Sequence, residues 1–447
     1  MKRIKMTLIG GGSLEWTPKL LVDLALTDEL KGNHICLHDI DKEALSLMHR
    51  LGKKIIKEAG NDFHLSSTTS LEEALEDTNY VILSISAGGL TTMRYDLEIP
   101  LKYGVYQSVG DTVGPGGLSR ALRNIPVVVE IAKKMESLCP DAWLINYTNP
   151  MSTLCRAINK TTRIKTVGLC HELLLVLRTL KRIFEVEKDS DIKVKTAGIN
   201  HFSWILELKI KDKDGFPLLK EYIEREQEEL KKQINSLDWK SLNPFKDNNL
   251  LKFELFKTYG FLPAEGDRHV AEFFPCFLTE KTSAGKKYGI KLTRIEDRLE
   301  RIERGRAEVQ SMIDGNQSIS LECSGEKACD IISAIAIGKD STLMMNLPNR
   351  GQIANLPSEV IVETAGLANA NGVHPILAGD LPAGILGLTL KHITNQEMIV
   401  EAALTGNKKL ALQALVNDPL VKNCEDAAKM LDEFLQANAD YLPQFRL

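Results

Sequence analysis

Short apolar runs alternate with amphipathic stretches over roughly the first 170 residues. Runs of apolar and β-branched residues predict strands, and apolar positions spaced three to four apart predict helices. We expect strands at residues 4–9, 34–38, 65–69, 80–85, 141–146 and 166–169, and helices at 18–30, 41–58, 71–75 and 124–137. This alternation is typical of an α/β unit with a doubly wound parallel sheet.

The pattern changes after about residue 195. Residues 192–208 alternate like strands, and residues 202–211 are expected to form a hairpin with the next segment of the chain, turning at 211–215. Residues 218–237 form a highly charged helix, whose simplest interpretation is a solvated face. Strands near 318–320 and 343–346, then helices from 379 to 436, predict a mixed α+β domain. We therefore expect two domains, 1–195 and 196–447.

Composition excludes several classes of protein. With 43% hydrophobic and 26% charged residues the chain is globular, and a net charge of -4 lacks the basic excess of a nucleic-acid binder. No run of 18 apolar residues predicts a membrane span, and the N-terminus has no apolar signal region before its glycines. The eight cysteines form no C-x-x-C pair, so we expect reduced thiols in a cytoplasmic protein.

A glycine-rich turn follows the first predicted strand. Gly10, Gly11, Gly12 and Ser13 let backbone N–H groups approach a pyrophosphate at a helix N-terminus, although Glu15 replaces the third glycine of G-x-G-x-x-G. A plain tight turn is the alternative. Asp39 ends the second strand, where an acidic group binds ribose hydroxyls, which favours NAD. Gly88, after the strand at 80–85, is expected beside the nicotinamide half. These features predict a Rossmann-like dinucleotide site.

Further motifs each allow two interpretations. Arg94 is a surface residue or an anion anchor, Asp111 a turn cap or a catalytic carboxylate, and Asn149 a turn residue or a ligand for sugar hydroxyls. Cys170 and His201 are a buried pair of ordinary residues or, as thiolate and imidazole, ligands of a divalent transition metal.

Taken in order, these motifs resemble glycoside hydrolase family 4, the NAD- and divalent-metal-dependent glycosidases. Gly-Asp-Thr-Val-Gly-Pro-Gly-Gly at 110–117, Asn-Tyr-Thr-Asn-Pro-Met at 146–151, Cys-His-Glu at 170–172 and Gly-Ile-Asn-His at 198–201 carry the resemblance. Gly-Asp-Arg-His at 266–269 and the segment 346–357 extend it. The resemblance covers residues 4 to about 363.

The resemblance implies roles for individual residues. Cys170 and His201 resemble the metal ligands, usually for Mn²⁺, and Asn149 resembles a substrate-binding residue. Asp267 matches the general base of members with aspartate there. Asp111 resembles a second acidic residue near the reacting centre, and His171 is a candidate proton donor.

The family's chemistry departs from the two-carboxylate scheme of other glycosidases. NAD⁺ takes a hydride from C3 of the sugar, and the metal polarises the new ketone, so that a base can remove the C2 proton. The C1 substituent is then eliminated, water adds, and NADH returns the hydride. The cofactor is therefore not consumed.

Two stretches indicate the sugar. Cys-His-Glu-Leu at 170–173 resembles the branch acting on non-phosphorylated α-glycosides, and residues 107–111 and 264–269 look closest to the α-galacturonidases. A uronate carboxylate needs a cation, and the candidates are Arg94, Arg268, His269 and Arg350. We therefore expect an α-galacturonidase acting on pectin-derived oligogalacturonates. An α-glucuronidase and a neutral α-glucosidase or α-galactosidase are the alternatives within the family.

Two other classes share parts of the pattern. A malate- or lactate-type NAD-dependent dehydrogenase would have the same Rossmann half, and a nucleotide-binding protein would have lost the chemistry. The paired Cys170 and His201 favour the glycosidase. The family also implies a homodimer or homotetramer, with a sugar as partner and neither nucleic acid nor membrane.

Overall fold

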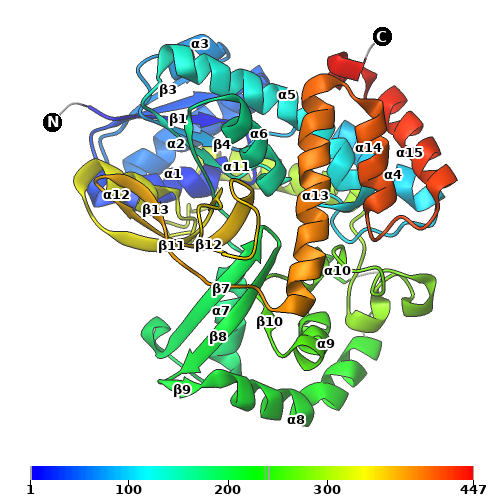
Figure 1. Ribbon diagram of the computed structural model, residues 1–447. Helices are drawn as coiled ribbons and strands as arrows, with labels where there is room; N and C mark the ends of the chain where they lie inside the picture. Colours follow the sequence, from blue (N-terminus) through cyan, green and yellow to red (C-terminus); the bar gives the residue numbers. More distant parts are fainter. Residues whose placement is uncertain (1–2, 237, 240–241, 446–447) are drawn as a thin grey trace.

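The described residues form one mixed sheet of 13 strands that runs through the molecule (Figure 1). The computed structural model describes residues 3–236, 238–239 and 242–445. The strands are β1 (Lys5–Ile9), β2 (His34–His38), β3 (His64–Thr68), β4 (Tyr80–Leu83), β5 (Trp143–Asn146), β6 (Lys165–Gly168), β7 (Ile192–Ile199), β8 (Phe202–Ile210), β9 (Lys213–Asp214), β10 (Leu262–Pro263), β11 (Ser341–Pro348), β12 (Ile361–Asn369) and β13 (Gly372–Pro375). Their order is β10-β8-β7-β12-β11-β6-β5-β4-β1-β2-β3, with β9 beside β8 and β13 beside β12.

Helices cover both faces of the parallel part of this sheet (Figure 1). They are α1 (Thr17–Leu26), α2 (Lys42–Glu58), α3 (Leu71–Leu75), α4 (Gly89–Lys102), α5 (Gly114–Leu138), α6 (Met151–Thr161), α7 (Glu172–Ile183), α8 (Gly215–Asn235), α9 (Leu250–Tyr259), α10 (Asp267–Ala271), α11 (Ile295–Asp314), α12 (Ala328–Ile337), α13 (Ala383–Thr405), α14 (Lys408–Asn417) and α15 (Cys424–Ala437). Short 3-10 turns lie at Asp28–Leu30, Asp189–Asp191, Glu280–Thr282, Lys286–Tyr288, Ala439–Tyr441 and Pro443–Phe445.

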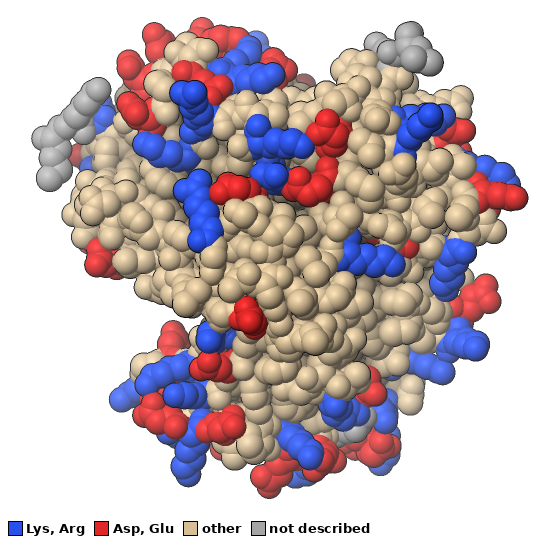
Figure 2. Space-filling model, viewed as in Figure 1, with Lys and Arg blue, Asp and Glu red and all other residues tan. Residues whose placement is uncertain are grey.

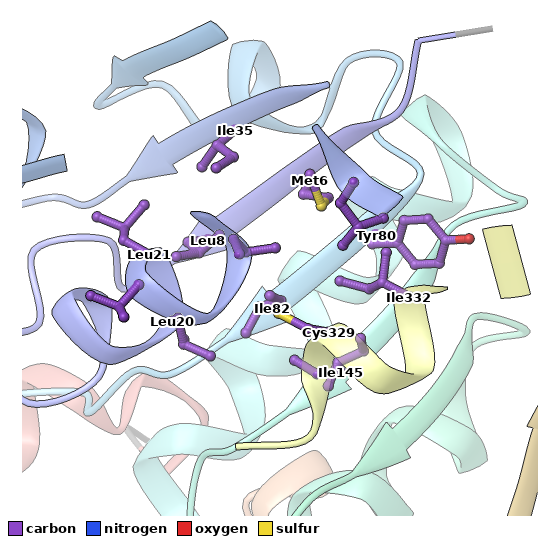
Figure 3. Close-up of a cluster of buried hydrophobic side chains, with 14 of the residues drawn as sticks. Met6, Leu8, Leu20, Leu21, Ile35, Tyr80, Ile82, Ile145, Cys329 and Ile332 are labelled. Carbon is purple, nitrogen blue, oxygen red and sulfur yellow. The ribbon is translucent and has the colours of Figure 1, made fainter. Parts of the chain in front are cut away.

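The first half of the chain confirms the predicted Rossmann-like α/β fold. β3, β2, β1, β4, β5 and β6 pair in parallel, in that order. Figure 3 shows one face of the core, where Met6, Leu8 and Ile82 of the strands meet Leu20 of α1 and Ile332 of α12. Strands buried on both faces need apolar side chains at nearly every position, which explains the unbroken apolar runs.

The second half of the chain extends the same sheet with antiparallel strands. β11 joins β6 where Asn346 pairs with Gly168, and β12 joins β7 where Glu363 pairs with Gly198. Helices and antiparallel strands mix here, as expected for the α+β part. Because strands from both parts share one sheet, the division at residues 195 and 196 stays a prediction.

Two details of the secondary structure were predicted wrongly. Residues 318–320 form no strand; Ile319 packs on the core from an irregular segment instead. The helix expected to begin at residue 124 begins at Gly114 instead. Its first turn contains glycines because neighbouring backbone lies close: a Cβ at Gly117 would lie 2.5 Å from the carbonyl carbon of Thr112. The hairpin expected between residues 202–211 and the next segment is confirmed, because β8 pairs with β9 across a turn at Lys211 and Asp212, although β8 pairs chiefly with the preceding β7. The charged helix α8 matches its prediction, although residue 237 lies outside the described residues.

The surface agrees with the balanced composition. In Figure 2 acidic and basic side chains are interspersed over the visible face. Among the described residues, no helix is both long and apolar enough to cross a membrane.

A buried ion pair joins α4 to α5. Arg123 Nη1 donates to Asp96 Oδ1 at 2.7 Å, Nη2 donates to Oδ2, and Nε donates to the carbonyl oxygen of Ala87 at 3.0 Å. Both charged side chains are fully buried. Two parallel hydrogen bonds make this a bidentate contact, which fixes orientation as well as distance.

Removing one partner of this pair should destabilise the fold strongly, because the other charge would stay buried and unpaired. We expect Asp96→Asn to lower the free energy of unfolding by about 3–5 kcal/mol, measured by urea denaturation followed by circular dichroism. Lys160→Met, which breaks the exposed 2.7 Å pair with Glu401, should change it by less than about 1 kcal/mol. Equal changes in the free energy of unfolding for the two variants would contradict the interpretation that the Asp96–Arg123 pair stabilises the fold.

Candidate active site

The carboxyl edge of the parallel strands collects the predicted motifs. The glycine turn follows β1, Gly88 follows β4, Asn149 follows β5 and Cys170 follows β6. These four strands are neighbours in the sheet. Ligands of doubly wound folds bind outside this edge.

The glycine turn is held against the end of β2. Gly10 and Gly11 donate to the carbonyl oxygen of His38 at 3.0 and 2.8 Å. The N–H of Gly12 donates to Asp39 Oδ2 at 2.9 Å, and the N–H of Asp41 donates to Asp39 Oδ1 at 3.0 Å. The Asp39 carboxylate is thus fixed beside the turn. Ser13 lies in the same turn, where its Oγ accepts from the Trp16 N–H at 3.1 Å.

Gly88 supplies a second special backbone position. It precedes α4 with a φ of 76°, in the left-handed region, and a Cβ there would lie 2.1 Å from Thr92 Cγ2. The preceding Ala87 N–H donates to Asn124 Oδ1 at 2.8 Å. The shape of this loop is therefore set by the fold.

Asp111, His201 and His269 form a first cluster of possible metal ligands, with one donor atom of each within 4.8 Å of the others. Asp111 lies in the loop before α5, His201 in the β7–β8 turn and His269 in α10. The Nδ1 atoms of His201 and His269 are 2.8 Å apart, and Thr112 Oγ1 lies 2.8 Å from His201 Nδ1. His201 has a φ of 63°, a strained conformation for a residue with a side chain.

The electrostatics of this first cluster suit a cation. Burial lowers the pKa of His201 to about 3 and that of His269 to about 4, so both imidazoles are neutral and keep a lone pair. Burial raises the pKa of Asp111, but His201, which is protonated at the low pH where Asp111 titrates, and the Arg120 guanidinium outweigh it and lower the pKa to about 2. Asp111 is therefore an anion at neutral pH.

Cys170, Glu265 and Glu363 form a second cluster, again with donor atoms within 4.8 Å of one another. Burial, and then the carboxylates of Glu363 and Glu265, raise the pKa of the Cys170 thiol well above its ordinary value. Burial likewise raises the pKa of both glutamates. Glu265 Oε2 is buried without a hydrogen-bond partner among the described residues. Such a set of closely spaced acids fits a divalent cation, whose charge would offset their mutual repulsion.

The predicted ligands Cys170 and His201 thus belong to two different clusters, and their pairing stays a prediction. One hydrogen bond and one shared electrostatic neighbour connect the clusters. Asn200, next to His201, donates to Glu363 Oε2 at 2.9 Å. Burial has the largest effect on the pKa of both Cys170 and His201, and the Glu172 carboxylate acts on both as well, raising each pKa.

Asp267, the predicted base, is 2% exposed and contacts the first turn of α9. Its two carboxylate oxygens accept the N–H groups of Leu251 and Lys252, each at 3.1 Å. The Lys252 ammonium lies 3.5 Å from Oδ1. Burial and then the Asp247 carboxylate raise the pKa of Asp267 to about 7. This pKa suits a general base, whereas the hydrogen bonds are those of a helix cap.

His171, the candidate proton donor, is partly exposed between two carboxylates. Its Nδ1 lies 3.5 Å from Glu326 Oε1 and its Nε2 lies 4.0 Å from Glu172 Oε1. Glu172 Oε1 also lies 4.0 Å from His269 Nε2. Glu172 therefore stands between His171 and the first cluster.

The predicted carboxylate-binding cations lie in different surroundings. Arg94 forms ion pairs with Glu98 at 2.7 Å and Glu296 at 3.2 Å. Arg350 is exposed, 3.6 Å from Glu359. Arg268 is buried and donates to the Ser108 carbonyl oxygen and to Thr293 Oγ1. His269 belongs to the first cluster. Of the four, Arg268 and His269 lie next to the candidate site residues in sequence and space.

Asn149 presents a buried Oδ1 without a partner among the described residues. Its main-chain oxygen accepts from Arg120 Nε at 3.0 Å. An unsatisfied buried acceptor beside a cation is consistent with a group that binds substrate hydroxyls, and that role stays a prediction.

Several residues at the site were not predicted. Glu272 accepts the N–H groups of Val109 and Gly110 at 2.7 and 2.9 Å and so holds the loop before Asp111. Glu363 and Glu265 complete the second cluster, and Arg120 faces Asp111. Glu363 carried a usable signal, because it is a single charge within the mainly apolar strand Ile361–Asn369. The sequence pattern around Glu272, Glu265 and Arg120 does not mark these residues as functional.

Comparison with known proteins agrees with this geometry. The family 4 glycosyl hydrolase model matches residues 5–186, and that of the family's C-terminal domain matches residues 196–421. An alpha-galacturonidase of Thermoanaerobacter italicus is 38% identical over 98% of this chain and 97% of its own.

Solved structures agree as well. The crystal structure of lplD from Bacillus subtilis, described as a candidate glucosidase, has a TM-score of 0.89 and 36% identity, covering 97% of this chain and 100% of that one. A 6-phospho-beta glucosidase of Thermotoga maritima, solved with manganese, NAD⁺ and glucose-6-phosphate, has a TM-score of 0.78 and 25% identity, covering 98% and 99%. These matches favour a glycosidase over the dehydrogenase and binding-protein alternatives, and the chain belongs to family 4 of the glycosyl hydrolases.

Proposed function

We propose that this glycosidase is an α-galacturonidase that removes galacturonate from short pectin-derived oligomers, using NAD⁺ and a divalent metal such as Mn²⁺. The observation that carries the proposal is that two clusters of possible metal ligands, one around His201 and one around Cys170, lie at the sheet edge where the glycine turn follows β1. The similarity to an alpha-galacturonidase over nearly the whole chain supports the choice of sugar.

The residues present fit both cofactors. The glycine turn with Asp39 suits the pyrophosphate and ribose of NAD⁺, with Gly88 at the nicotinamide end, and Cys170 and His201 are the proposed metal ligands. When bound, the dinucleotide supplies reversible oxidation at C3 of the sugar, and the metal supplies polarisation of the adjacent oxygens.

The chain's own residues hold and move protons around the sugar. Asp267 is the proposed base for the C2 proton, and the partly exposed imidazole of His171 is the proposed proton donor to the leaving oxygen. Asp111, ionised beside two imidazoles, balances positive charge at the reacting centre. Asn149 would accept from a sugar hydroxyl through its free Oδ1. A cytoplasmic location and a homodimeric or homotetrameric state belong to the same proposal.

A substrate panel tests the proposed specificity. With NAD⁺, Mn²⁺ and a thiol reductant, di-galacturonate should be cleaved faster than aldobiouronate, maltose, melibiose or 6-phosphoglycosides. Absorbance should show no net accumulation of NADH, because the hydride returns within each turnover. Preferred cleavage of a phosphorylated or neutral sugar would refute the proposed substrate, and stoichiometric NADH would refute the mechanism.

Replacing the proposed thiolate ligand should separate metal binding from dinucleotide binding. We expect Cys170→Ser to lower kcat/KM at least ~100-fold and to weaken Mn²⁺ binding in isothermal titration, while NAD⁺ affinity stays within about twofold. Cys424→Ser, at the exposed start of α15, is the matched control. Unaltered Mn²⁺ affinity in Cys170→Ser would exclude this thiol as a ligand.

Asp267→Asn distinguishes a base from a helix cap. The amide keeps one of the two acceptor oxygens for α9 but cannot take a proton, so we expect a moderate loss of melting temperature and a fall of about 10²- to 10⁴-fold in the kcat of the folded protein. A large loss of melting temperature with specific activity retained by the folded fraction would show that the residue serves only α9.

A further inference from the structure

Three guanidinium groups surround one phenylalanine ring beside the first cluster. The guanidinium carbons of Arg298, Arg301 and Arg268 lie 4.7, 4.9 and 5.1 Å from the centre of the Phe245 ring. Arg298 and Arg301 come from α11, whereas Arg268 comes from α10. Like charges repel, so such a group needs an anion nearby.

The anions in this neighbourhood are largely engaged elsewhere. Arg301 Nη2 donates to Glu15 Oε1 at 2.8 Å. The acidic residues of α11 that flank Arg298 have partners of their own: Asp297 binds Arg294, and Glu296 binds Arg94. One cation of the three is thus neutralised by a direct contact.

Arg298 has no such contact. Within residues 3–236, 238–239 and 242–445 it makes neither a hydrogen bond nor an ion pair, and its Nε is buried without an acceptor. Arg268 is 9% exposed, and toward the described residues its guanidinium donates only through Nη2 and leaves its buried Nε without an acceptor. Two neighbouring guanidinium groups therefore each keep an unused, buried N–H. An unpaired buried donor on a charged group is costly unless a ligand supplies the acceptor.

The position of this pair indicates which ligand. Burial lowers the pKa of both arginines. The Glu15 carboxylate and then that of Asp111 oppose this effect at Arg298, and the carboxylates of Glu272, Glu172 and Asp111 oppose it at Arg268, so both arginines lie within electrostatic reach of the first cluster. Arg268 also stands between Asp267 and His269 in sequence. Further along α11, Arg301 binds Glu15 and Gly305 lies near Leu14. This part of the helix therefore runs beside the glycine turn. Arg298 and Arg268 thus lie between the glycine turn and the first cluster.

We infer that Arg298, with Arg268 beside it on the Phe245 ring, is the receptor for the carboxylate of an anionic sugar substrate. This inference rests on the proposed function and deepens it, since it assigns uronate specificity to a residue of α11. A planar guanidinium gives the bidentate grip that a carboxylate accepts and a hydroxymethyl group does not.

The test compares Arg298→Met with Arg304→Met in the full-length enzyme with NAD⁺ and Mn²⁺. Arg304 is an exposed arginine on the same helix and serves as the matched control. Arg298→Met should lower kcat/KM for di-galacturonate by about 10- to 100-fold, mainly through KM, and should lower the ratio of kcat/KM for di-galacturonate to that for melibiose by a similar factor. Arg298→Lys should give intermediate values of kcat/KM and of this ratio, because lysine keeps the charge but cannot form the bidentate contact of a guanidinium.

Direct binding gives a readout independent of turnover. Isothermal titration should show that wild-type enzyme prefers galacturonate to galactose and that Arg298→Met loses this preference, while melting temperature and NAD⁺ affinity stay near the wild-type values. An unchanged preference in a folded Arg298→Met variant would overturn the inference. Loss of NAD⁺ affinity with the sugar preference intact would also overturn it, by assigning Arg298 to the pyrophosphate.

Measurements on the wild-type enzyme distinguish a failure of the proposed function from a failure of the assignment to Arg298. If wild-type enzyme neither binds nor cleaves galacturonides in preference to neutral sugars, the proposed function fails, and the carboxylate receptor fails with it. If wild-type enzyme shows the preference and the variant keeps it, only the assignment to Arg298 fails.

Discussion

One buried carboxylate, that of Glu363, connects the two halves of the site. Its Oε2 accepts the side-chain amides of Asn200 and Asn346, each at 2.9 Å. Asn200 follows β7, Asn346 lies on β11 and Glu363 lies on β12, so one group connects three strands. A buried acid is tolerated only where donors replace its water, and two amide groups do so here.

This contact determines where the remaining parts of the site can be. β11 also pairs with β6, whose end leads to Cys170, and the residue after Asn200 is His201. The thiol and the imidazole are therefore fixed relative to each other by sheet pairing rather than by flexible loops. Sites on regular elements hold their geometry more precisely than sites on loops alone.

The parallel half of the fold could be predicted from the sequence because its physical constraint is local. Strands covered by helices on both faces must be apolar throughout, as at residues 80–83 and 143–146, and the connecting glycines mark the strand ends. The antiparallel half could not be predicted in the same way. The pairing of β11 with β6 and of β12 with β7 joins residues about 165 to 180 positions apart, and no local pattern specifies such a partner.

The residues of the site likewise include some that could be predicted from the sequence and some that could not. Cys170, His201 and Asp111 stood out because their short motifs resemble those of a known family. Glu265 and Arg298 did not, since an acid or a base in a polar stretch is usually a solvated residue. Their significance arises from what surrounds them after folding, namely a missing partner for a buried polar atom in each case.

The first glycine of the dinucleotide turn has a consequence for how such motifs are interpreted. A methyl group on Gly10 would lie 1.9 Å from the main-chain oxygen of Ser84, and the residue has a φ of 89°. That collision is with the neighbouring strand's own backbone, so the packing of β1 against β4 demands glycine whether or not any nucleotide binds. A related protein that no longer bound the cofactor would still need this glycine. Its presence in such a protein would therefore indicate the architecture of the sheet and not the retention of the chemistry.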